Sequence, residues 1–306
     1  MQSIRRHLAA ALTVAVVTTL ALPATASTQS APAPVQQTPR PPAPEPSERI
    51  VYGEAPSQFI EVYRPSGPGP YPVAIFIHGG CYVTREASVR TARRMGADLA
   101  QHGVVAWNIA YRRTDEEGAA FPGLFQDIAT ATDRVRAEAN RLNLDLSKVV
   151  IAGHSAGGHL ALWSAGRPNI PATSPLHSDT PLRPAAVVGI AGPGMFDGMQ
   201  PLLDNTCGAD TFVRLVGAPS AERPDLLADT SPDRLLPFGV PVRLLVGSRD
   251  QVVPPVFVDG FAKAATAAGD AVDLTIIEGA DHIDPVDVRT DAWVQVRTAI
   301  LTAVGR

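Results

Sequence analysis

The sequence of 306 residues predicts an α/β fold in which a mostly parallel, doubly wound sheet carries helices on both faces. Two observations predict it. Short apolar runs rich in β-branched residues alternate with stretches of helical periodicity, the pattern of successive βα units. Apolar residues make up 45% of the chain and charged residues 18%, which is typical of a globular protein and excludes a fully disordered or collagen-like one.

The N-terminal segment 1–26 is typical of a secretory signal peptide. Arg5 and Arg6 precede an apolar stretch from Leu8 to Leu22, and Ala24-Thr25-Ala26 has the small residues of a cleavage site. The competing hypothesis is a membrane anchor, but the apolar stretch is shorter than the roughly 20 residues that span a bilayer. We therefore expect cleavage, a secreted protein in an extracellular or periplasmic location, and no stable membrane span afterwards.

A Pro-rich linker, residues 27–47, is expected next. The run from Ala31 to Pro46 holds seven Pro in 16 residues and almost no large apolar side chains, so we expect it to be extended and solvated. Residues 48–306 show no internal repeat and no second linker of this kind. They predict a single domain.

The first element expected along the domain is an antiparallel hairpin at a sheet edge. Its strands are Ile50–Tyr52 and Gln58–Tyr63, which flank Gly53 and Pro56. Apolar runs of the kind found in buried parallel strands follow. They are Val73–Ile77, Val104–Ile109, Lys148–Ala152, Ala186–Ile190, Val242–Val246 and Val272–Ile277.

One clear helical stripe lies between these runs. Apolar residues recur at spacings of three and four from Leu124 to Leu142, which predicts a helix packed on the sheet. From Gly192 to Pro237 the periodicity is weak and Pro, Gly and Asp are frequent, so we expect short helices and loops over one end of the sheet.

The formal net charge of −4, without a basic patch, excludes the electrostatic surface that nucleic acid requires. Two cysteines, Cys81 and Cys207, lack the CxxC spacing of a metal site, and neither a metal nor an organic cofactor is expected. In an exported protein these cysteines can form a disulfide, or each can be a small buried residue. The sequence leaves these two alternatives open.

A candidate nucleophile follows the expected strand at 148–152. Gly153-His154-Ser155-Ala156-Gly157-Gly158 is a Gly-x-Ser-x-Gly pattern between a strand and a helical stretch, the context in which a sharp turn exposes a serine hydroxyl. The alternative is a Gly-rich turn that cradles phosphate. The strand and helix around the pattern favour Ser155 as a nucleophile above a helix N-terminus.

A serine needs a base, and the base needs a carboxylate. His282 follows the last expected strand, whereas His159 lies on the helix of Ser155 and His177 in a Pro-rich loop. Asp250 follows the strand before it, and Asp284 is the second candidate carboxylate. The order Ser155, Asp250, His282 is the one expected of an α/β-hydrolase triad.

Oxyanion donors are expected from the loop His78-Gly79-Gly80-Cys81-Tyr82, which follows the strand at 73–77. Two glycines there let backbone N–H groups turn inward. We assign the N–H groups of Gly80 and Cys81, together with that of Ala156. His78 is expected to brace this loop and to take no part as acid or base.

With these residues the chain resembles the α/β-hydrolase superfamily, and within it the esterases whose oxyanion loop begins His-Gly-Gly. The resemblance runs from about Ile50 to the end. It also includes Tyr111-Arg112, Phe121-Pro122 with Asp127, Ser231-Pro232, and Asp250 with Val253-Pro254. Hormone-sensitive-lipase-like, feruloyl or acetyl esterase, and kynurenine-formamidase-like branches all share such a set. At the position after His-Gly-Gly, the lipase-like branch has a third Gly and the formamidase-like branch usually has an aromatic residue. This chain has Cys81 there, so the resemblance does not decide between the branches.

The function expected is that of a secreted serine hydrolase, a carboxylesterase that forms an acyl-enzyme on Ser155 and acts on a small-molecule ester. Hydrolysis of an amide or formamide uses the same machinery and is the alternative. Ser231-Pro232 and the segment after Asp250 also resemble the catalytic domain of prolyl-oligopeptidase-type peptidases. A noncatalytic binder on the same fold is the remaining alternative.

Overall fold

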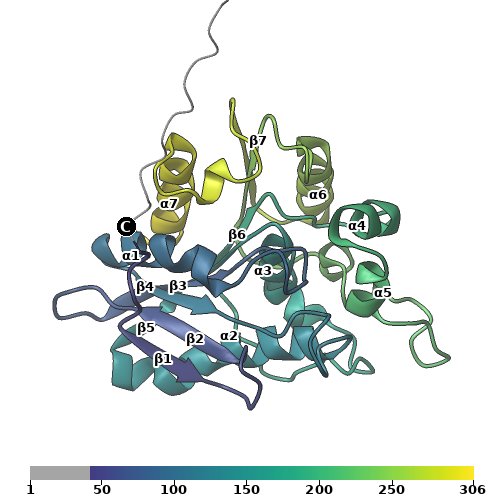
Figure 1. Ribbon diagram of the computed structural model, residues 1–306, viewed down its shortest axis with the longest axis horizontal. Coiled ribbons are helices and arrows are strands. Elements are labelled where there is room, and N and C mark those ends of the chain that lie inside the picture. Colours follow the sequence, from purple (N-terminus) through teal and green to yellow (C-terminus); the bar gives the residue numbers. More distant parts are fainter. Residues whose placement is uncertain (1–41) are drawn as a thin grey trace, which may run out of the picture. The chain divides into compact units, whose positions relative to one another are not determined.

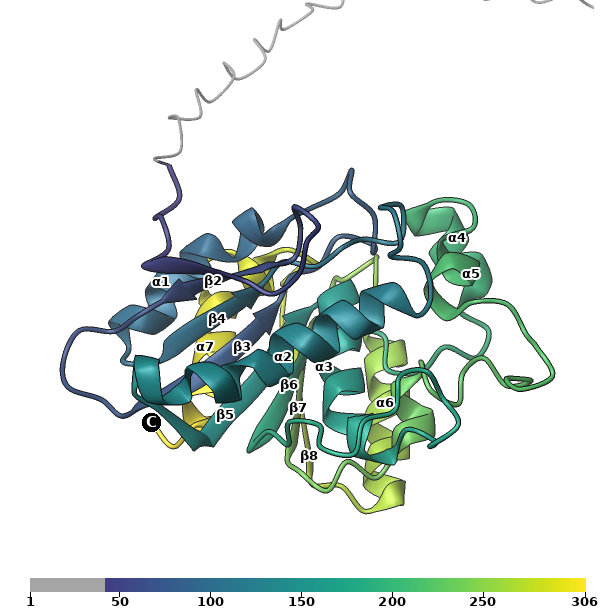
Figure 2. The same cartoon turned by 90° about the horizontal axis from the view of Figure 1, so that it is seen from below.

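A single sheet organises the part of the chain that the computed structural model describes, residues 42–306. Its strand order is β1-β2-β4-β3-β5-β6-β7-β8; Figure 1 labels the first seven strands of the chain, and Figure 2 labels β8. The expected signal peptide, and the expected linker up to residue 41, lie outside the described residues. The strands are β1 (Glu48–Val51), β2 (Phe59–Tyr63), β3 (Tyr71–Ile77), β4 (Val105–Ile109), β5 (Leu144–His154), β6 (Ala186–Ile190), β7 (Val242–Gly247) and β8 (Val272–Ile277).

The predicted edge hairpin is confirmed, because β1 pairs with β2 and β2 with β4 in antiparallel register. All other pairings are parallel. Strands β3 to β7 lie inside the sheet, and nearly all of their residues are buried. A strand covered on both faces must be apolar throughout, which is why these segments are continuous apolar runs.

Helices cover both faces of the sheet, as predicted (Figure 2). α2 (Gly123–Leu142), α3 (Ala156–Gly166) and α6 (Pro255–Ala268) share one apolar core with one face. α1 (Arg93–Gln101) and α7 (Asp291–Ala303) share a second core with the other. Every residue of α3 is buried, so this helix is the central element of the larger core.

The region after β6 forms short helices, as expected. They are α4 (Gln200–Cys207), α5 (Thr211–Val216) and the 3₁₀ turn η3 (Pro232–Leu235). Further 3₁₀ turns are η1 (Val89–Ala92), η2 (Arg167–Asn169) and η4 (Asp284–Val286). Within residues 42–306, no helix has the length and apolar character needed to cross a bilayer.

The strand register brings the loops that carry the candidate site residues to the carboxyl-terminal edge of the sheet. Ile77 at the end of β3 pairs with Gly153 at the end of β5, so the loop after β3 lies beside the turn that carries Ser155. Gly247 at the end of β7 pairs with Ile277 at the end of β8. The loops after β7 and β8 are therefore neighbours as well.

The last residues before β1 contact the folded unit. Tyr63 Oη donates a hydrogen bond to the Pro44 carbonyl over 3.0 Å, and Arg93 forms an ion pair with Glu45 over 2.8 Å. Arg93 also binds the fully buried Glu61 on β2. This end of the expected linker thus lies along the sheet.

Candidate active site

Ser155 lies in a strained turn between β5 and α3. Its φ is 55° and its ψ is −123°, a conformation that side-chain-bearing residues rarely adopt. Two glycines make this turn possible. A Cβ on Gly157 would lie 2.0 Å from the Ile77 carbonyl oxygen, and a Cβ on Gly153 would lie 2.0 Å from the Gly157 carbonyl oxygen. The Gly-x-Ser-x-Gly spacing thus reflects two backbone contacts that leave no room for a side chain.

Asp250 and His282 meet across the loops that follow β7 and β8. His282 Nδ1 lies 2.7 Å from Asp250 Oδ2. The other carboxylate oxygen, Oδ1, accepts the backbone N–H groups of Val252 at 2.9 Å and Val253 at 2.8 Å. Asp250 is 1% exposed, and these hydrogen bonds fix its carboxyl group in one orientation. A carboxylate held in this way requires the proton of His282 on Nδ1 and leaves Nε2 as an acceptor.

The other candidates lie elsewhere. Asp284 accepts the N–H of Asp281 within its own turn. His159 bonds through Nε2 to the Thr230 carbonyl, and His177 bonds through Nδ1 to the Ile170 carbonyl. In the described chain, the side chains of these three residues share no hydrogen bond with Ser155 or His282.

The Ser155 hydroxyl makes no hydrogen bond with the ring of His282 in the described part of the chain. The two residues are connected through His154, whose Nε2 donates to the His282 carbonyl over 2.8 Å. The rings of His154 and His282 lie 4.6 Å apart. Burial and the neighbouring His282 ring lower the pKa of His154 to about 3, so His154 stays neutral. In enzymes without substrate, the hydrogen bond between nucleophile and base is often long.

Backbone N–H groups are available beside Ser155. Gly80, Cys81 and Tyr82 have φ values of 120°, 53° and 60°, an unusual succession of left-handed residues. Within residues 42–306 no hydrogen bond uses the N–H of Gly80 or Cys81. Ala156 is the first residue of α3, where an N–H has no partner inside the helix. These three groups are therefore free to bind an anion.

His78 packs inside this loop. Its ring stacks on Tyr111 at 4.6 Å, and Tyr111 Oη donates to the His78 carbonyl over 2.9 Å. Burial lowers the pKa of His78 to about 4, so the ring is neutral at neutral pH. These contacts are those of a residue that supports the loop.

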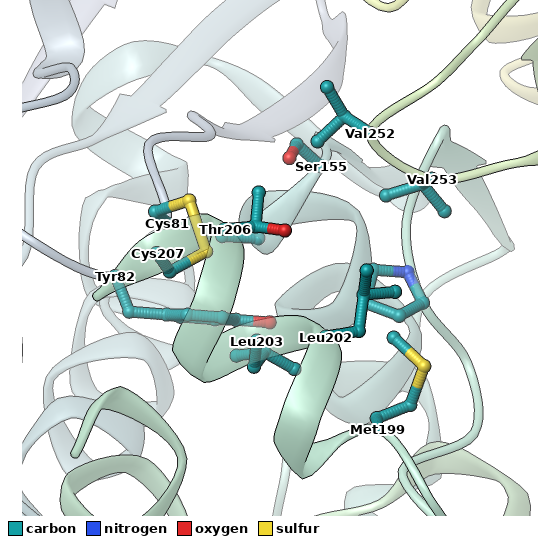
Figure 3. Close-up of a pocket in the computed structure, with 12 residues that line it drawn as sticks. Cys81, Tyr82, Ser155, Met199, Leu202, Leu203, Thr206, Cys207, Val252 and Val253 are labelled. Carbon is teal, nitrogen blue, oxygen red and sulfur yellow. A yellow bond between two sulfur atoms is a disulfide. The ribbon is translucent and has the colours of Figure 1, made fainter. Parts of the chain in front are cut away.

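A pocket of about 390 Å³ of empty space, including its mouth, opens beside Ser155 (Figure 3). Part of the wall comes from the loop after β3, with Cys81 and Tyr82. Another part comes from α4 and from the loop after β7. Apolar groups dominate the wall. The lining residues are Cys81, Tyr82, Ser155, Ala156, Pro193, Met199, Leu202, Leu203, Thr206, Cys207, Val252 and Val253.

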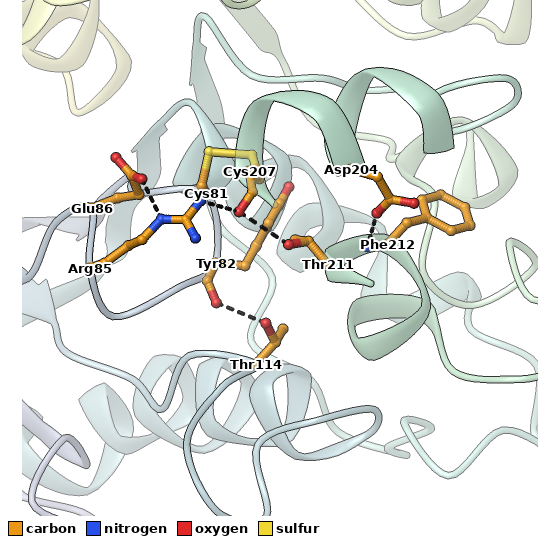
Figure 4. The surroundings of a disulfide bond; sticks show 9 residues. All are labelled: Cys81, Tyr82, Arg85, Glu86, Thr114, Asp204, Cys207, Thr211 and Phe212. Carbon is orange, nitrogen blue, oxygen red and sulfur yellow. Dashed lines mark hydrogen bonds and ion pairs between the residues drawn. A yellow bond between two sulfur atoms is a disulfide. The ribbon is translucent and has the colours of Figure 1, made fainter. Parts of the chain in front are cut away.

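A disulfide joins Cys81 in the loop after β3 to Cys207 at the end of α4 (Figure 4). It settles the question that the sequence left open. The Cys207 carbonyl also accepts hydrogen bonds from Arg85 Nη2 at 2.7 Å and from Thr211 Oγ1 at 3.3 Å. Covalent and hydrogen bonds together attach α4 to the loop that lines the pocket.

Some residues of the site escaped the sequence analysis. His154 was treated only as part of the turn, because nothing in the sequence indicates that it contacts a loop 128 residues away. Met199, Leu202 and Leu203 reach the pocket from α4, a helix too short to be recognised by its periodicity. The pairing of Cys81 with Cys207 was the one available signal that α4 lies here.

The described residues hold no group of three or more His, Cys, Asp or Glu side chains arranged to bind a metal ion.

Comparisons with known proteins agree with this architecture. Residues 60–263 match the model of the BD-FAE family. Esterase LipC of Mycobacterium tuberculosis is 30% identical over 244 residues, which are 76% of this chain and 59% of the relative. The chain thus spans less than two thirds of the length of that relative.

Solved structures share the fold. A truncated carbohydrate esterase from gut microbiota is 20% identical, with a TM-score of 0.67 over 88% of this chain and 100% of the other. The propionate-bound esterase Est2 of Thermogutta terrifontis is 24% identical, with a TM-score of 0.68 over 87% and 96% of the two chains. Matched over most of its folded part, the chain belongs to the BD-FAE family and has the α/β-hydrolase fold.

Proposed function

We propose that this protein is a carboxylesterase in which Ser155 is the nucleophile. The observation that carries the proposal is the strained position of Ser155 in the lining of a pocket, together with an Asp250–His282 pair that is joined over 2.7 Å and contacts the adjacent His154. The names of the related proteins, all esterases, support the same class of reaction.

In the first half-reaction, His282 Nε2 takes the proton of the Ser155 hydroxyl as Oγ attacks the ester carbonyl. Asp250 stabilises the imidazolium that forms, and the N–H groups of Gly80, Cys81 and Ala156 bind the oxyanion. The alcohol leaves with the proton from His282, and the acyl group stays on Ser155. In the second half-reaction, His282 takes a proton from water as the water oxygen attacks the acyl-enzyme, and His282 then returns that proton to Ser155 Oγ as the acyl–Oγ bond breaks and the acid leaves.

Replacement of Ser155 tests the proposal. Ser155→Ala should lower kcat for a p-nitrophenyl ester by roughly 10⁴-fold or more, as expected when a triad member is lost. Ser164→Ala is a matched control, because Ser164 lies on the same buried helix and bonds only to the Leu160 carbonyl. A fluorophosphonate probe should label the parent protein and not Ser155→Ala. Equal hydrolysis by parent and Ser155→Ala would refute the assignment.

Export is part of the proposal. The signal-like segment 1–26 supports it, and so does the Cys81–Cys207 disulfide, since such bonds persist in oxidising compartments. Sequencing of the mature N-terminus should find it at or near Ser27. An N-terminus still at Met1 on protein recovered from the producing cells would contradict cleavage.

A further inference from the structure

Tyr82 occupies a special place in the pocket. It follows Cys81 directly, has a left-handed backbone and is 2% exposed. In Figure 3 its ring runs below the disulfide, and its oxygen points to the interior of the group of lining residues. The side chain thus belongs to the wall of the pocket that contains Ser155.

The hydroxyl of Tyr82 is buried and has no hydrogen-bond partner in the described chain. Buried polar groups in proteins almost always have a partner, so an unpaired one inside a binding pocket indicates a partner that binds there. Burial raises the pKa of Tyr82 well above its usual range, so the hydroxyl keeps its proton and remains a donor.

Among residues 42–306, no neighbouring group accepts a hydrogen bond from this donor. The His159 ring meets the Tyr82 ring edge-on, with centroids 5.7 Å apart. His159 Nε2 lies 2.9 Å from the Thr230 carbonyl and therefore carries the proton, which leaves Nδ1 as an acceptor. That Nδ1 is also unpartnered, so the Tyr82 hydroxyl does not bond to it.

The surrounding wall makes this hydroxyl selective. The side chains that line the pocket opposite Tyr82 are apolar, among them Met199, Leu202 and Leu203. A hydrocarbon bound there gains apolar contacts but leaves the Tyr82 hydroxyl unpaired. A site that offers a buried donor discriminates against a ligand that lacks the matching acceptor, because the donor then stays unsatisfied.

We propose that Tyr82 is a specificity-determining residue that donates a hydrogen bond to an oxygen atom in the part of the ester that fills this pocket. The preferred substrates are short esters that carry an ether, hydroxyl or carbonyl oxygen in addition to the ester group. The inference rests on the proposed esterase function of Ser155 and adds to it the chemical class of the substrate.

The test compares matched esters on the parent protein and on Tyr82→Phe, which removes only the hydroxyl. Three pairs place one ether oxygen in place of a CH₂ group: p-nitrophenyl butanoate with methoxyacetate, p-nitrophenyl pentanoate with 3-methoxypropanoate, and butyl acetate with 2-methoxyethyl acetate. The ratio of kcat/KM within each pair is measured for both proteins. Differences in intrinsic reactivity cancel when the two ratios are compared.

We expect Tyr82→Phe to lower the ether-to-hydrocarbon ratio by on the order of 10-fold for at least one pair, the value of one hydrogen bond. Tyr63→Phe is the matched control, because Tyr63 lies on β2, is not among the residues that line the pocket, and bonds through its hydroxyl to the Pro44 carbonyl. Product inhibition of the parent protein is a second measurement, independent of the variant. Methoxyacetate should inhibit several-fold more strongly than butanoate.

A ratio that stays within about twofold for all three pairs overturns the inference. The same holds if Tyr82→Phe leaves every ratio unchanged but lowers the melting temperature, since the hydroxyl would then bond to a buried water of structural importance. Ser155→Ala is assayed alongside. Loss of hydrolysis in Ser155→Ala with unchanged ratios in Tyr82→Phe rejects only the specificity role, whereas activity retained by Ser155→Ala rejects the esterase assignment itself.

Discussion

At the scale of single residues, Asp250 has the most demanding geometry of the site. Its carboxylate binds His282 through one oxygen and two backbone N–H groups through the other. Because both oxygens are engaged, the carboxylate cannot turn without losing hydrogen bonds. The orientation and the tautomer of His282 therefore depend on Asp250.

We predict that Asp250→Asn lowers kcat for a p-nitrophenyl ester by on the order of 10⁴-fold. An amide that keeps its oxygen toward Val252 and Val253 presents its NH₂ group to His282, which forces the proton onto Nε2 and prevents that nitrogen from acting as a base. Steady-state kinetics at neutral pH measure the effect. The control is Asp284→Asn, since Asp284 bonds within its own turn. A large loss in Asp284→Asn with little loss in Asp250→Asn would reverse the assignment.

The positions of the candidate site residues were predictable where a residue directly follows a strand. Ser155, Asp250 and His282 are the candidates because the sequence context marks the carboxyl ends of β5, β7 and β8, and the structure joins two of them, Asp250 and His282, by a hydrogen bond. The hydrogen bond from His154 to the His282 carbonyl and the unpaired Tyr82 hydroxyl were not predictable. Both depend on side-chain orientation between segments far apart in the sequence.

At the scale of elements, the disulfide makes α4 a wall of the pocket. Reduction, or the double substitution of Cys81 and Cys207 by Ser, should lower the free energy of unfolding by about 2–4 kcal/mol. It should also lower kcat by up to about 10²-fold, the effect of losing one oxyanion donor, because the N–H of Cys81 is one of the donors that we propose. Denaturant unfolding and steady-state kinetics with and without reductant measure both quantities.

The double variant also serves as the control for the reductant. The chain has two cysteines and both are in this bond, so the reductant should have no further effect on the variant. If reduced, folded parent protein keeps its full kcat, the disulfide does not position the oxyanion loop.

Elements with a strong pattern were predictable, and those with a weak pattern were not. The strands and α2 lie within a few residues of the expected ranges, since each is either a continuous apolar run or a regular stripe. α4 and α5 have eight and six residues, too few for periodicity to define them. Their presence in 192–237 was expected, but their contact with the oxyanion loop is a tertiary property.

At the scale of the whole molecule, three buried histidines make stability depend on pH. Burial lowers the pKa of His78 to about 4, that of His154 to about 3 and that of His159 to about 4. In the unfolded chain these rings titrate near 6.5. Below that pH the unfolded state therefore binds more protons than the folded state, and stability falls as pH falls.

We predict that the free energy of unfolding is highest above pH 6.5 and declines toward pH 4, with a limiting slope of about 1.4 kcal/mol per pH unit for each histidine. Denaturant unfolding over a series of pH values measures the slope. His159→Gln, which can still donate to the Thr230 carbonyl, should reduce the slope by one histidine's share. His102→Gln is the control at an exposed position. A slope unaffected by His159→Gln would show that this ring is not the source.

The architecture was predictable at this scale because alternating strands and helices allow few arrangements. The predicted edge hairpin, the parallel interior and the helices on both faces are all present. The ion pair between Glu45 and Arg93 was not predicted. A Pro-rich composition indicates that a segment tends to be extended, but it does not indicate which residue of the domain the segment contacts.

The two helices beside the pocket differ in burial. Every residue of α3 is buried, whereas half of the residues of α4 are exposed to solvent. Substitutions in α3 beneath Ser155 disturb the packing of the larger core, whereas the exposed Thr206 can change at small cost to folding. Directed evolution toward new esters should therefore draw its beneficial substitutions from α4. This difference separates the side chains that shape the pocket from the helix that holds Ser155 in place.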